Sequence, residues 1–401
     1  MLRVLSVAAA ALIATTAVAQ ADAFDRLILK LNGHITGVGA VVDQSTTGDL
    51  DEFVGAVDTG LFGSAILPLD GGGEIGARVA LDLDYSSHVD TFLNDAGRSD
   101  ILEEAWLYGE GRLGRVQLGL MDGAADVLGL TPPSVSSSIR VDNPEIYLLA
   151  FPCQEPFCSP DPGFPGSLFN PNGMQLRSDV HGSDNFLKIM YVTPVFDGFR
   201  LAISYAPDGS RYLGELFGDD ELNEQTNIVD IAASYTGTVG MLDVAASVGY
   251  VFGDNANPRF TDNDDLEDLG AAIKLGYNEW TFGAAYRLTN VAGGGPVVQA
   301  EFDANVIEGY QTEVWSFGLM YEAGPWAASV NYITMIEEVP FSTEQDGSGL
   351  QFALGYTINE DFRITGGYQR FDFDGPLNFC STGFCDTLDA NVGYIETSFN
   401  F

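Results

Sequence analysis

The chain has 401 residues, and its 57 acidic against 17 basic residues give a formal charge of −40. Such an acidic surface excludes nucleic acid and anionic headgroup surfaces as partners and favours cations. Beyond the N-terminal segment, no apolar run approaches the roughly 18 residues that a membrane-spanning helix needs.

The N-terminus carries the features of a secretory signal peptide. Arg3 precedes an apolar run from Val4 to Val18, and small residues follow at Ala19 and Ala21. These features predict that residues 1–21 are removed on export and that residues 22–401 form one domain.

From residue 26 onward, apolar and polar residues alternate in segment after segment, which is the period of a β-strand. About sixteen strands are predicted, near residues 26–42, 53–69, 74–86, 101–111, 115–121, 185–194, 199–206, 228–237, 240–252, 268–277, 280–289, 312–322, 326–334, 348–357, 362–371 and 388–401. Short turns alternate with longer polar connections between these strands. That alternation is typical of an even-stranded antiparallel barrel.

The predicted fold class is therefore all-β, a closed transmembrane antiparallel β-barrel of about 16 strands. A barrel crosses lipid without helices, because neighbouring strands pair every backbone group and closure removes the free edges. Aromatic residues also recur six positions apart on one parity: Phe199 with Tyr205, Trp280 with Tyr286, Trp326 with Tyr332, and Phe362 with Tyr368. Membrane interfaces select aromatic residues, so this spacing favours the barrel over the alternative, a water-soluble β-sandwich.

Strand parity also predicts which charged side chains face the interior of the barrel. Lys30 and His34 alternate with Leu29 and Leu31 in the first strand, and the same reasoning applies to Arg78 and Arg115 in later strands. A charge on the lipid face would cost about 2–4 kcal/mol at the membrane midplane. We predict that these four basic residues form the wall side of a pore constriction.

One connection, residues 122–184, is far longer than the others and holds much of the proline. Wall side chains cannot fill so wide a barrel, so we predict that this third loop folds inward and constricts the pore. The alternative is a loop that stays outside. Its acidic residues Asp142, Glu145, Glu155 and Asp161 would form the loop side of the constriction. A field between Asp142 and Glu145 and the wall bases Lys30, Arg78 and Arg115 would align polar solutes.

Four cysteines occur as two equally spaced pairs, Cys153 with Cys158 and Cys380 with Cys385, both in predicted loops. Two local disulfides are the leading interpretation for an exported chain, although the sequence allows three pairings. A four-thiolate metal site is the disfavoured alternative.

An acidic run containing Asp262, Asp264, Asp265 and Glu267 also lies in a predicted loop. Its carboxylates suit surface Ca²⁺ beside lipopolysaccharide phosphates, although the spacing differs from an EF-hand and a solvated loop is the simpler interpretation. No other cofactor is predicted.

The whole mature chain resembles the general-diffusion porins of Gram-negative bacteria, and more narrowly the alphaproteobacterial type. The resemblance rests on the signal peptide, the first strand Leu27 to Gly39, the stretch Gly114 to Gly119 followed by Asp122 to Asp126, the long third loop and the terminal Phe401. It implies a sixteen-stranded homotrimeric barrel in the outer membrane, in contact with lipid and lipopolysaccharide. In that family the inward third loop places acids opposite wall bases, and Phe401 resembles the C-terminal aromatic that serves as the assembly signal.

The last strand departs slightly from the pattern. Ala390, Val392 and Tyr394 are apolar on one parity, whereas Ile395, Phe399 and Phe401 are apolar on the other. We expect a bulge near Tyr394.

The predicted function is passive diffusion of small hydrophilic solutes and ions through a water-filled, weakly cation-selective channel. A substrate-specific outer-membrane channel is the alternative. An enzyme is disfavoured, because the chain has only three histidines and neither a Gly-x-Ser-x-Gly nor a His-Glu-x-x-His motif.

Overall fold

The computed structural model describes residues 26–45, 53–82, 85–86, 102–142, 176–183, 185–209, 225–255, 265–290, 311–338, 345–380 and 383–401. The predicted signal peptide, residues 1–21, lies outside this part of the chain. Among the described residues, no helix combines the length and apolar character required to cross a membrane.

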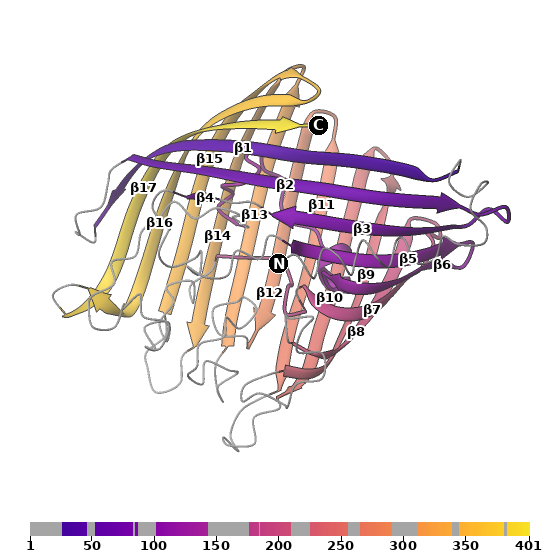
Figure 1. The fold of residues 1–401 in the computed structure, drawn as a ribbon. Helices are drawn as coiled ribbons and strands as arrows, with labels where there is room; N and C mark the ends of the chain where they lie inside the picture. Colours follow the sequence, from indigo (N-terminus) through magenta and orange to yellow (C-terminus); the bar gives the residue numbers. More distant parts are fainter. Residues whose placement is uncertain are drawn as a thin grey trace.

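The described residues form one continuous antiparallel sheet that closes on itself (Figure 1). Each strand pairs with its neighbours in sequence, and β1 pairs with both β2 and β17. The strands are β1 (Ile28–Gln44), β2 (Phe53–Pro68), β3 (Glu74–Asp82), β4 (Tyr85–Ser86), β5 (Leu102–Gly111), β6 (Gly114–Met121), β7 (Phe186–Val192), β8 (Phe199–Asp208), β9 (Gln225–Val239), β10 (Leu242–Asn255), β11 (Leu266–Tyr277), β12 (Trp280–Thr289), β13 (Gln311–Ala323), β14 (Trp326–Glu338), β15 (Gln345–Asn359), β16 (Phe362–Cys380) and β17 (Gly383–Asn400).

The seventeen segments make sixteen strands, because β4 continues β3. Gly60 of β2 lies opposite Asp82 of β3, and Val57 lies opposite Tyr85 of β4 in the same register. The predicted barrel of about 16 strands is confirmed, and the predicted short turns all join neighbouring strands at one end, here called the short-turn end. The described part includes one short helix, α3 (Ala124–Val127), in the long connection after β6.

The outer surface of the barrel is apolar, as the alternation predicts. Trp280 is 48% exposed and Trp326 52% exposed, so neither is buried against a second sheet. At the short-turn end, aromatic rings of neighbouring strands pack together, for example Trp280 on Tyr321 at a centroid distance of 4.7 Å. Tyr286 packs on Trp315 in the same way nearer the opposite end, at 4.6 Å. These two bands of aromatic residues exclude the β-sandwich and suit the two interfaces of a membrane.

The predicted bulge near Tyr394 is wrong. The pairing of β17 with β1 runs without interruption from Asn400 opposite His34 to Ala390 opposite Gln44. Ala390, Val392 and Tyr394 all point inward, where they pack in one apolar cluster with loop residues Ile139, Val141 and Leu176 and with wall residues Val38, Ala40, Val42, Val54 and Ala56. The inward residues are apolar because the long loop covers them, so no change of register is needed.

The last hairpin is longer than predicted. β16 extends to Cys380 and β17 starts at Gly383, with Cys380 opposite Gly383 and Cys385 opposite Leu377. These two cysteines therefore lie on strands and not in a loop. Cys153 and Cys158 lie outside the described residues, and for Cys380 and Cys385 only the strand pairing is described. Both disulfides therefore remain predictions.

The C-terminus completes the closure of the barrel. Phe401 exchanges two backbone hydrogen bonds with Gly33 of β1, with N–O distances of 2.9 and 3.0 Å. The Phe401 ring lies against Gly33, where a side chain would collide with it.

Gly33→Ala is expected to destabilise the barrel, because a Cβ there would lie 2.6 Å from Phe401 Cζ and 2.7 Å from the Gly60 carbonyl oxygen. We expect a loss of about 1–3 kcal/mol in the free energy of unfolding, measured by urea titration in detergent micelles. Gly39→Ala is the matched control, since the nearest atom to its Cβ would be Phe53 Cζ at 3.7 Å. An equal loss in both variants would contradict the close contact at Gly33.

Candidate functional site

The described parts of the long connection, Asp122–Asp142 and Leu176–Ser183, lie inside the barrel and are here called the internal loop. It starts on the inner faces of β8, β9 and β10, where α3 packs. The Ala125 N–H donates to the buried carboxylate of Asp230 on β9, at 2.8 Å. The inward-folded third loop is therefore confirmed for these residues.

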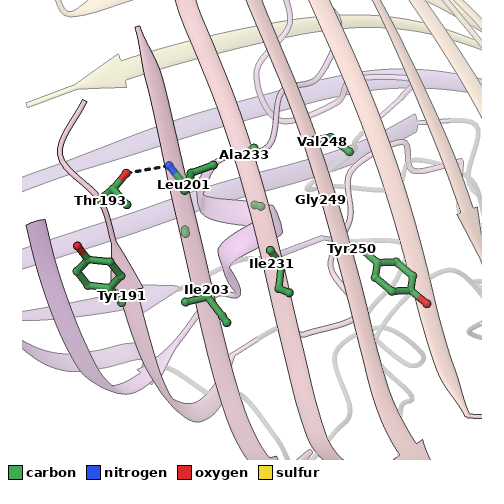
Figure 2. Close-up of a pocket in the computed structure, with 11 residues that line it drawn as sticks. Tyr191, Thr193, Leu201, Ile203, Ile231, Ala233, Val248, Gly249 and Tyr250 are labelled. Carbon is green, nitrogen blue, oxygen red and sulfur yellow. Dashed lines mark hydrogen bonds between the residues drawn. The ribbon is translucent and has the colours of Figure 1, made fainter. Parts of the chain in front are cut away.

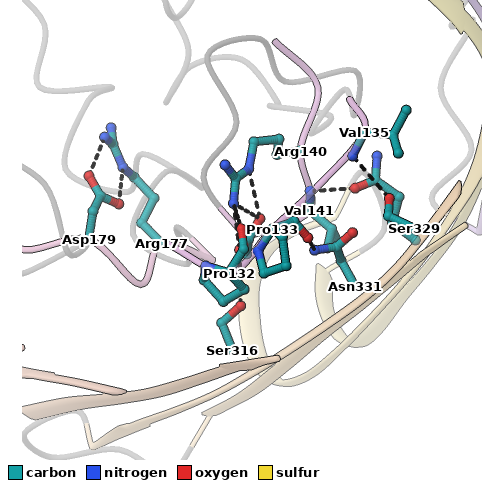
Figure 3. Close-up of polar contacts among 12 residues, drawn as sticks. Pro132, Pro133, Val135, Arg140, Val141, Arg177, Asp179, Ser316, Ser329 and Asn331 are labelled. Atoms are coloured by element: carbon teal, nitrogen blue, oxygen red, sulfur yellow. Dashed lines mark hydrogen bonds and ion pairs between the residues drawn. The ribbon is translucent and has the colours of Figure 1, made fainter. Parts of the chain in front are cut away.

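The loop then crosses the inner faces of β12, β13 and β14 (Figure 3). Asn331 Nδ2 donates to the Pro133 carbonyl oxygen at 2.8 Å, and the Val135 N–H donates to Ser329 Oγ at 3.1 Å. Gly283 makes room for this crossing, since a Cβ there would lie 2.5 Å from Pro133 Cδ. The wall is therefore shaped to receive the loop.

The far end of the loop is held by a carboxylate. Glu396 of β17 is buried and accepts hydrogen bonds from the Ser137 N–H and hydroxyl, both at 3.1 Å, and from the Ser138 N–H at 3.4 Å. Ser138 also donates its hydroxyl to Asp58 on β2. The loop thus reaches across the barrel from β6 to β17 and β2, and its anchored path narrows the interior.

Asp142 does not pair with any of the predicted wall bases. Its side chain is 0% exposed and pairs with Arg140 of the same loop, with 3.0 Å from the guanidinium nitrogen to Oδ2. Ser316 of β13 donates to the same carboxylate at 3.1 Å. Figure 3 shows Arg140 and Arg177 on the side of the loop that points away from the wall. The other predicted loop acids, Glu145, Glu155 and Asp161, lie outside the described residues.

The returning segment of the loop, Leu176–Ser183, packs against β11 and β12. The Gly182 N–H donates to Asp268 Oδ2 at 2.9 Å, and Asp268 forms a buried two-pronged ion pair with Arg287 at 2.8 and 2.7 Å. Asp179 pairs with Arg177 at 2.8 Å and lies 3.5 Å from His181. This end of the loop is therefore fixed by charge as well as by packing.

Burial and neighbouring charges together set the protonation of this segment. Burial alone would raise the pKa of Asp179, but Arg177 and His181 outweigh it and hold that pKa well below its usual range. Burial, together with the charges of Arg177 and Arg287, lowers the pKa of His181 despite the nearby Asp179. His181 is therefore neutral and Asp179 ionised at neutral pH.

Three of the four predicted wall bases pair with acids of the wall. His34 Nε2 lies 2.7 Å from Asp58 Oδ1, and Arg78 Nε lies 3.6 Å from Glu104 Oε2. Arg115 donates to Glu110 at 2.7 Å, close to the turn that joins β5 and β6. Lys30 is exposed and makes no ion pair within the described part of the chain.

The sequence analysis missed the partners Asp58, Glu104 and Glu396 and the loop arginines Arg140 and Arg177. Glu104 has the same strand parity as Trp106, which faces inward, so strand alternation could have identified Glu104 as a lumen residue. Arg140 and Arg177 carried no such signal, because parity does not apply to irregular segments.

The proposed Ca²⁺ ligands are only partly described. Glu267 accepts a hydrogen bond from the Tyr250 hydroxyl at 3.1 Å, and the Asp265 carbonyl oxygen accepts one from Asn290 at 2.6 Å. Asp262 and Asp264 lie outside the described residues. No group of three or more metal-ligating side chains occurs among the residues with described placement, so Ca²⁺ binding stays a prediction.

A concavity of about 530 Å³ lies on the outer face of β7–β10 and not in the interior (Figure 2). Its lining includes the exposed, outward-pointing side chains of Tyr191, Leu201, Ile203, Ile231 and Val248. An apolar depression on this face suits lipid chains and offers little to a hydrophilic solute.

Glu396→Ala is expected to loosen the far end of the internal loop, because Ser137 and Ser138 lose their shared acceptor. We expect about 1–3 kcal/mol lower stability by urea unfolding and noisier single-channel currents. Glu396→Gln keeps one acceptor oxygen and should show a smaller change. Glu338→Ala, at an exposed end of β14, is the control; an effect there as large as at Glu396 would refute the anchoring role.

Acid is expected to unseat the returning segment. Because the pKa of His181 is lowered in the seated loop, the released loop binds the proton more readily. Seating is therefore complete above the ordinary histidine pKa of about 6.5 and weakens as the pH falls below it. Channel conductance should change as the pH falls below about 6.5 in the native chain and stay constant there in His181→Gln. A His34→Gln variant that abolished the change would assign it elsewhere.

A family model described as "Gram-negative porin" matches residues 8–376. No curated sequence matches significantly.

Many solved structures share the fold. A mutant of the Rh. blastica porin is 17% identical with a TM-score of 0.51, covering 93% of this chain and 100% of that one. The anion-selective porin from Comamonas acidovorans is 14% identical with a TM-score of 0.56, covering 93% and 100%. The trimer form of OmpT from Vibrio cholerae is 12% identical with a TM-score of 0.56, covering 94% and 100%.

These identities establish the fold alone, whereas the family model covers most of the sequence. A closed antiparallel barrel with an apolar outside and a loop seated inside it is the architecture of a channel through the outer membrane. The chain belongs to the Gram-negative porin family, and it is an outer-membrane β-barrel channel and not an enzyme.

Proposed function

We propose that this channel passes small hydrophilic solutes and ions by passive diffusion and weakly prefers cations. The observation that carries the proposal is the internal loop, which is held by hydrogen bonds from Asp230 on one side of the barrel to Glu396 on the other. A loop fixed in this way narrows the interior without a moving part, which suits diffusion.

The preference for cations is supported by charge. Acidic partners lie within 3.6 Å of five lumen bases, His34, Arg78, Arg115, Arg140 and Arg177, whereas Lys30 makes no ion pair within the described residues. Their positive charge is therefore largely offset locally. The chain as a whole carries −40, which enriches cations near the channel mouths within the Debye length of about 8 Å at physiological salt.

The assembly belongs to the proposal as well. We infer that residues 1–21 are cleaved as a signal peptide, that Phe401 serves as the assembly signal and that the barrels associate as a homotrimer in contact with lipid and lipopolysaccharide. The trimer form of the similar OmpT is consistent with this association.

Reconstitution in a planar bilayer tests the function. We expect stepwise currents in KCl and, under a salt gradient, a reversal potential of the sign that cation preference requires. Absence of steps from folded protein would refute the channel, whereas an anion-selective potential would refute the charge argument alone.

Uptake into liposomes separates general from specific diffusion. We expect the rate to fall steadily with the size of uncharged sugars, because the anchored loop sets a fixed opening. One sugar that entered out of size order, with saturation, would favour the alternative, a substrate-specific channel.

A further inference from the structure

The inner wall of β2, β3, β5 and β6 carries an unusual stripe of alternating aromatic and basic side chains. It consists of Phe62, Arg78, Trp106, Tyr108 and Arg115, and is here called the inner-wall stripe. The Arg78 guanidinium lies 5.4 Å from the centre of the Phe62 ring and 5.9 Å from that of Trp106. Trp106 packs on Tyr108 at 5.5 Å, and the Arg115 guanidinium lies over Tyr108 at 4.9 Å.

These side chains face the lumen. The residues that alternate with them, Val79, Leu107 and Val116, are exposed large apolar side chains of the outer face. Glu104, which shares the parity of Trp106, accepts a hydrogen bond at 3.4 Å from the N–H of Asp122, the first residue of the internal loop. The stripe thus lies beside the root of the constricting loop.

Two wall glycines, Gly76 and Gly60, let the Tyr108 and Phe62 rings lie close against the wall. A Cβ at Gly76 would lie 2.3 Å from the Tyr108 ring, and one at Gly60 would lie 2.9 Å from the Phe62 ring. Trp106 and Tyr108 are buried, and they belong to an apolar cluster that includes Met190 and Val192 of β7 and residues of the internal loop. The guanidinium groups cover them, which orients the guanidiniums by cation–π attraction.

Arg78 differs from Arg115, Arg140 and Arg177 in its hydrogen bonding. Its side chain is 42% exposed, and its only ionic contact within the described residues is the long one from Nε to Glu104. That Nε is buried and has no hydrogen-bond partner there. Arg115, Arg140 and Arg177, in contrast, donate to carboxylates at 2.7–3.2 Å. Because the buried Nε faces Glu104, the two terminal nitrogens of Arg78 are the N–H donors left for a group that comes from the lumen, and the two rings hold them in place.

We propose that Arg78, backed by Phe62 and Trp106, is a binding site for small solutes that carry a carboxylate. A guanidinium binds the two oxygens of a carboxylate with two parallel hydrogen bonds, and stacking on aromatic rings keeps that geometry at a small entropy cost. The site deepens the proposed function and rests on it, since it adds a specific solute class to a diffusion channel. Trp106 acts as a positioning residue.

Current block by propionate tests the site, with propionamide as the uncharged molecule of the same shape. Native channels open in KCl should show saturable block by propionate and none by propionamide at the same concentrations. Arg78→Gln should raise the Kd for propionate about tenfold, and Arg78→Lys should also raise it, because an ammonium lacks the planar fork. Arg115→Gln, which removes the same charge from the same stripe, should leave the Kd unchanged.

The positioning role has a separate readout. Trp106→Leu should raise the Kd for propionate while the KCl step size stays constant, and Trp106→Phe, which keeps a ring, should restore the native Kd. A Kd unmoved by Trp106→Leu would overturn that role.

The two proposals fail in distinguishable ways. KCl steps without propionate block would overturn the carboxylate site and leave the channel standing, whereas a lack of KCl steps would overturn the channel itself. Equal losses in Arg78→Gln and Arg115→Gln would reduce the site to general lumen charge, and tighter block by inorganic phosphate than by propionate would overturn the carboxylate class. If Arg78→Gln yields no channels, the Kd for propionate of Arg78→Lys is compared with that of the native channel instead.

Discussion

The pairing of β17 with β1 is the interaction on which the rest of the structure depends. A single sheet in lipid would leave a row of unbonded backbone groups on each edge, and each such group would cost several kcal/mol. The continuous register between the first and last strands, ending in the two backbone hydrogen bonds of Gly33 with Phe401, removes both edges. Only after closure does the wall separate an outside that meets lipid from an inside that meets water.

The internal loop adds a third environment, a packed protein interior, to the lipid outside and the water inside the barrel. Where it lies against the wall, inward positions are apolar or carry buried hydrogen-bonding groups, as at Val392 and Glu396. Where it leaves the wall open, inward positions are charged, as at Arg78 and Arg115. The loop therefore divides the interior into a packed sector and a solvated sector, and solutes meet mainly the second.

Charge in the solvated sector is arranged in pairs and not as two opposed rows. Arg140 of the loop is held by Asp142 of the same loop, and Arg78 of the wall lies beside Glu104 of the wall. Close pairing weakens the field across the opening, because each pair acts at a distance as a dipole. Selectivity then depends on the few lumen bases without a close acid, such as Lys30, which is exposed and makes no ion pair within the described residues.

The sequence by itself determined the fold class, the approximate strands, the short turns, and which side of the wall Lys30, Arg78 and Arg115 face. Period-two alternation carries that information locally, since neighbouring side chains of a strand point to opposite solvents. The sequence also indicated that the long third loop turns inward, because the wall cannot fill so wide an interior.

Only the tertiary structure decided the partners. Asp142 turns to Arg140 and Ser316, Glu396 binds the backbone of the loop, and the apolar parity of Ala390, Val392 and Tyr394 reflects contact with that loop and not a bulge. Apart from the pair Asp142–Arg140, these contacts join residues more than a hundred positions apart, and an irregular loop has no period from which its path can be derived. Strand alternation records which side of the wall a residue faces, whereas its neighbours there are set by how the closed barrel and the loop pack together.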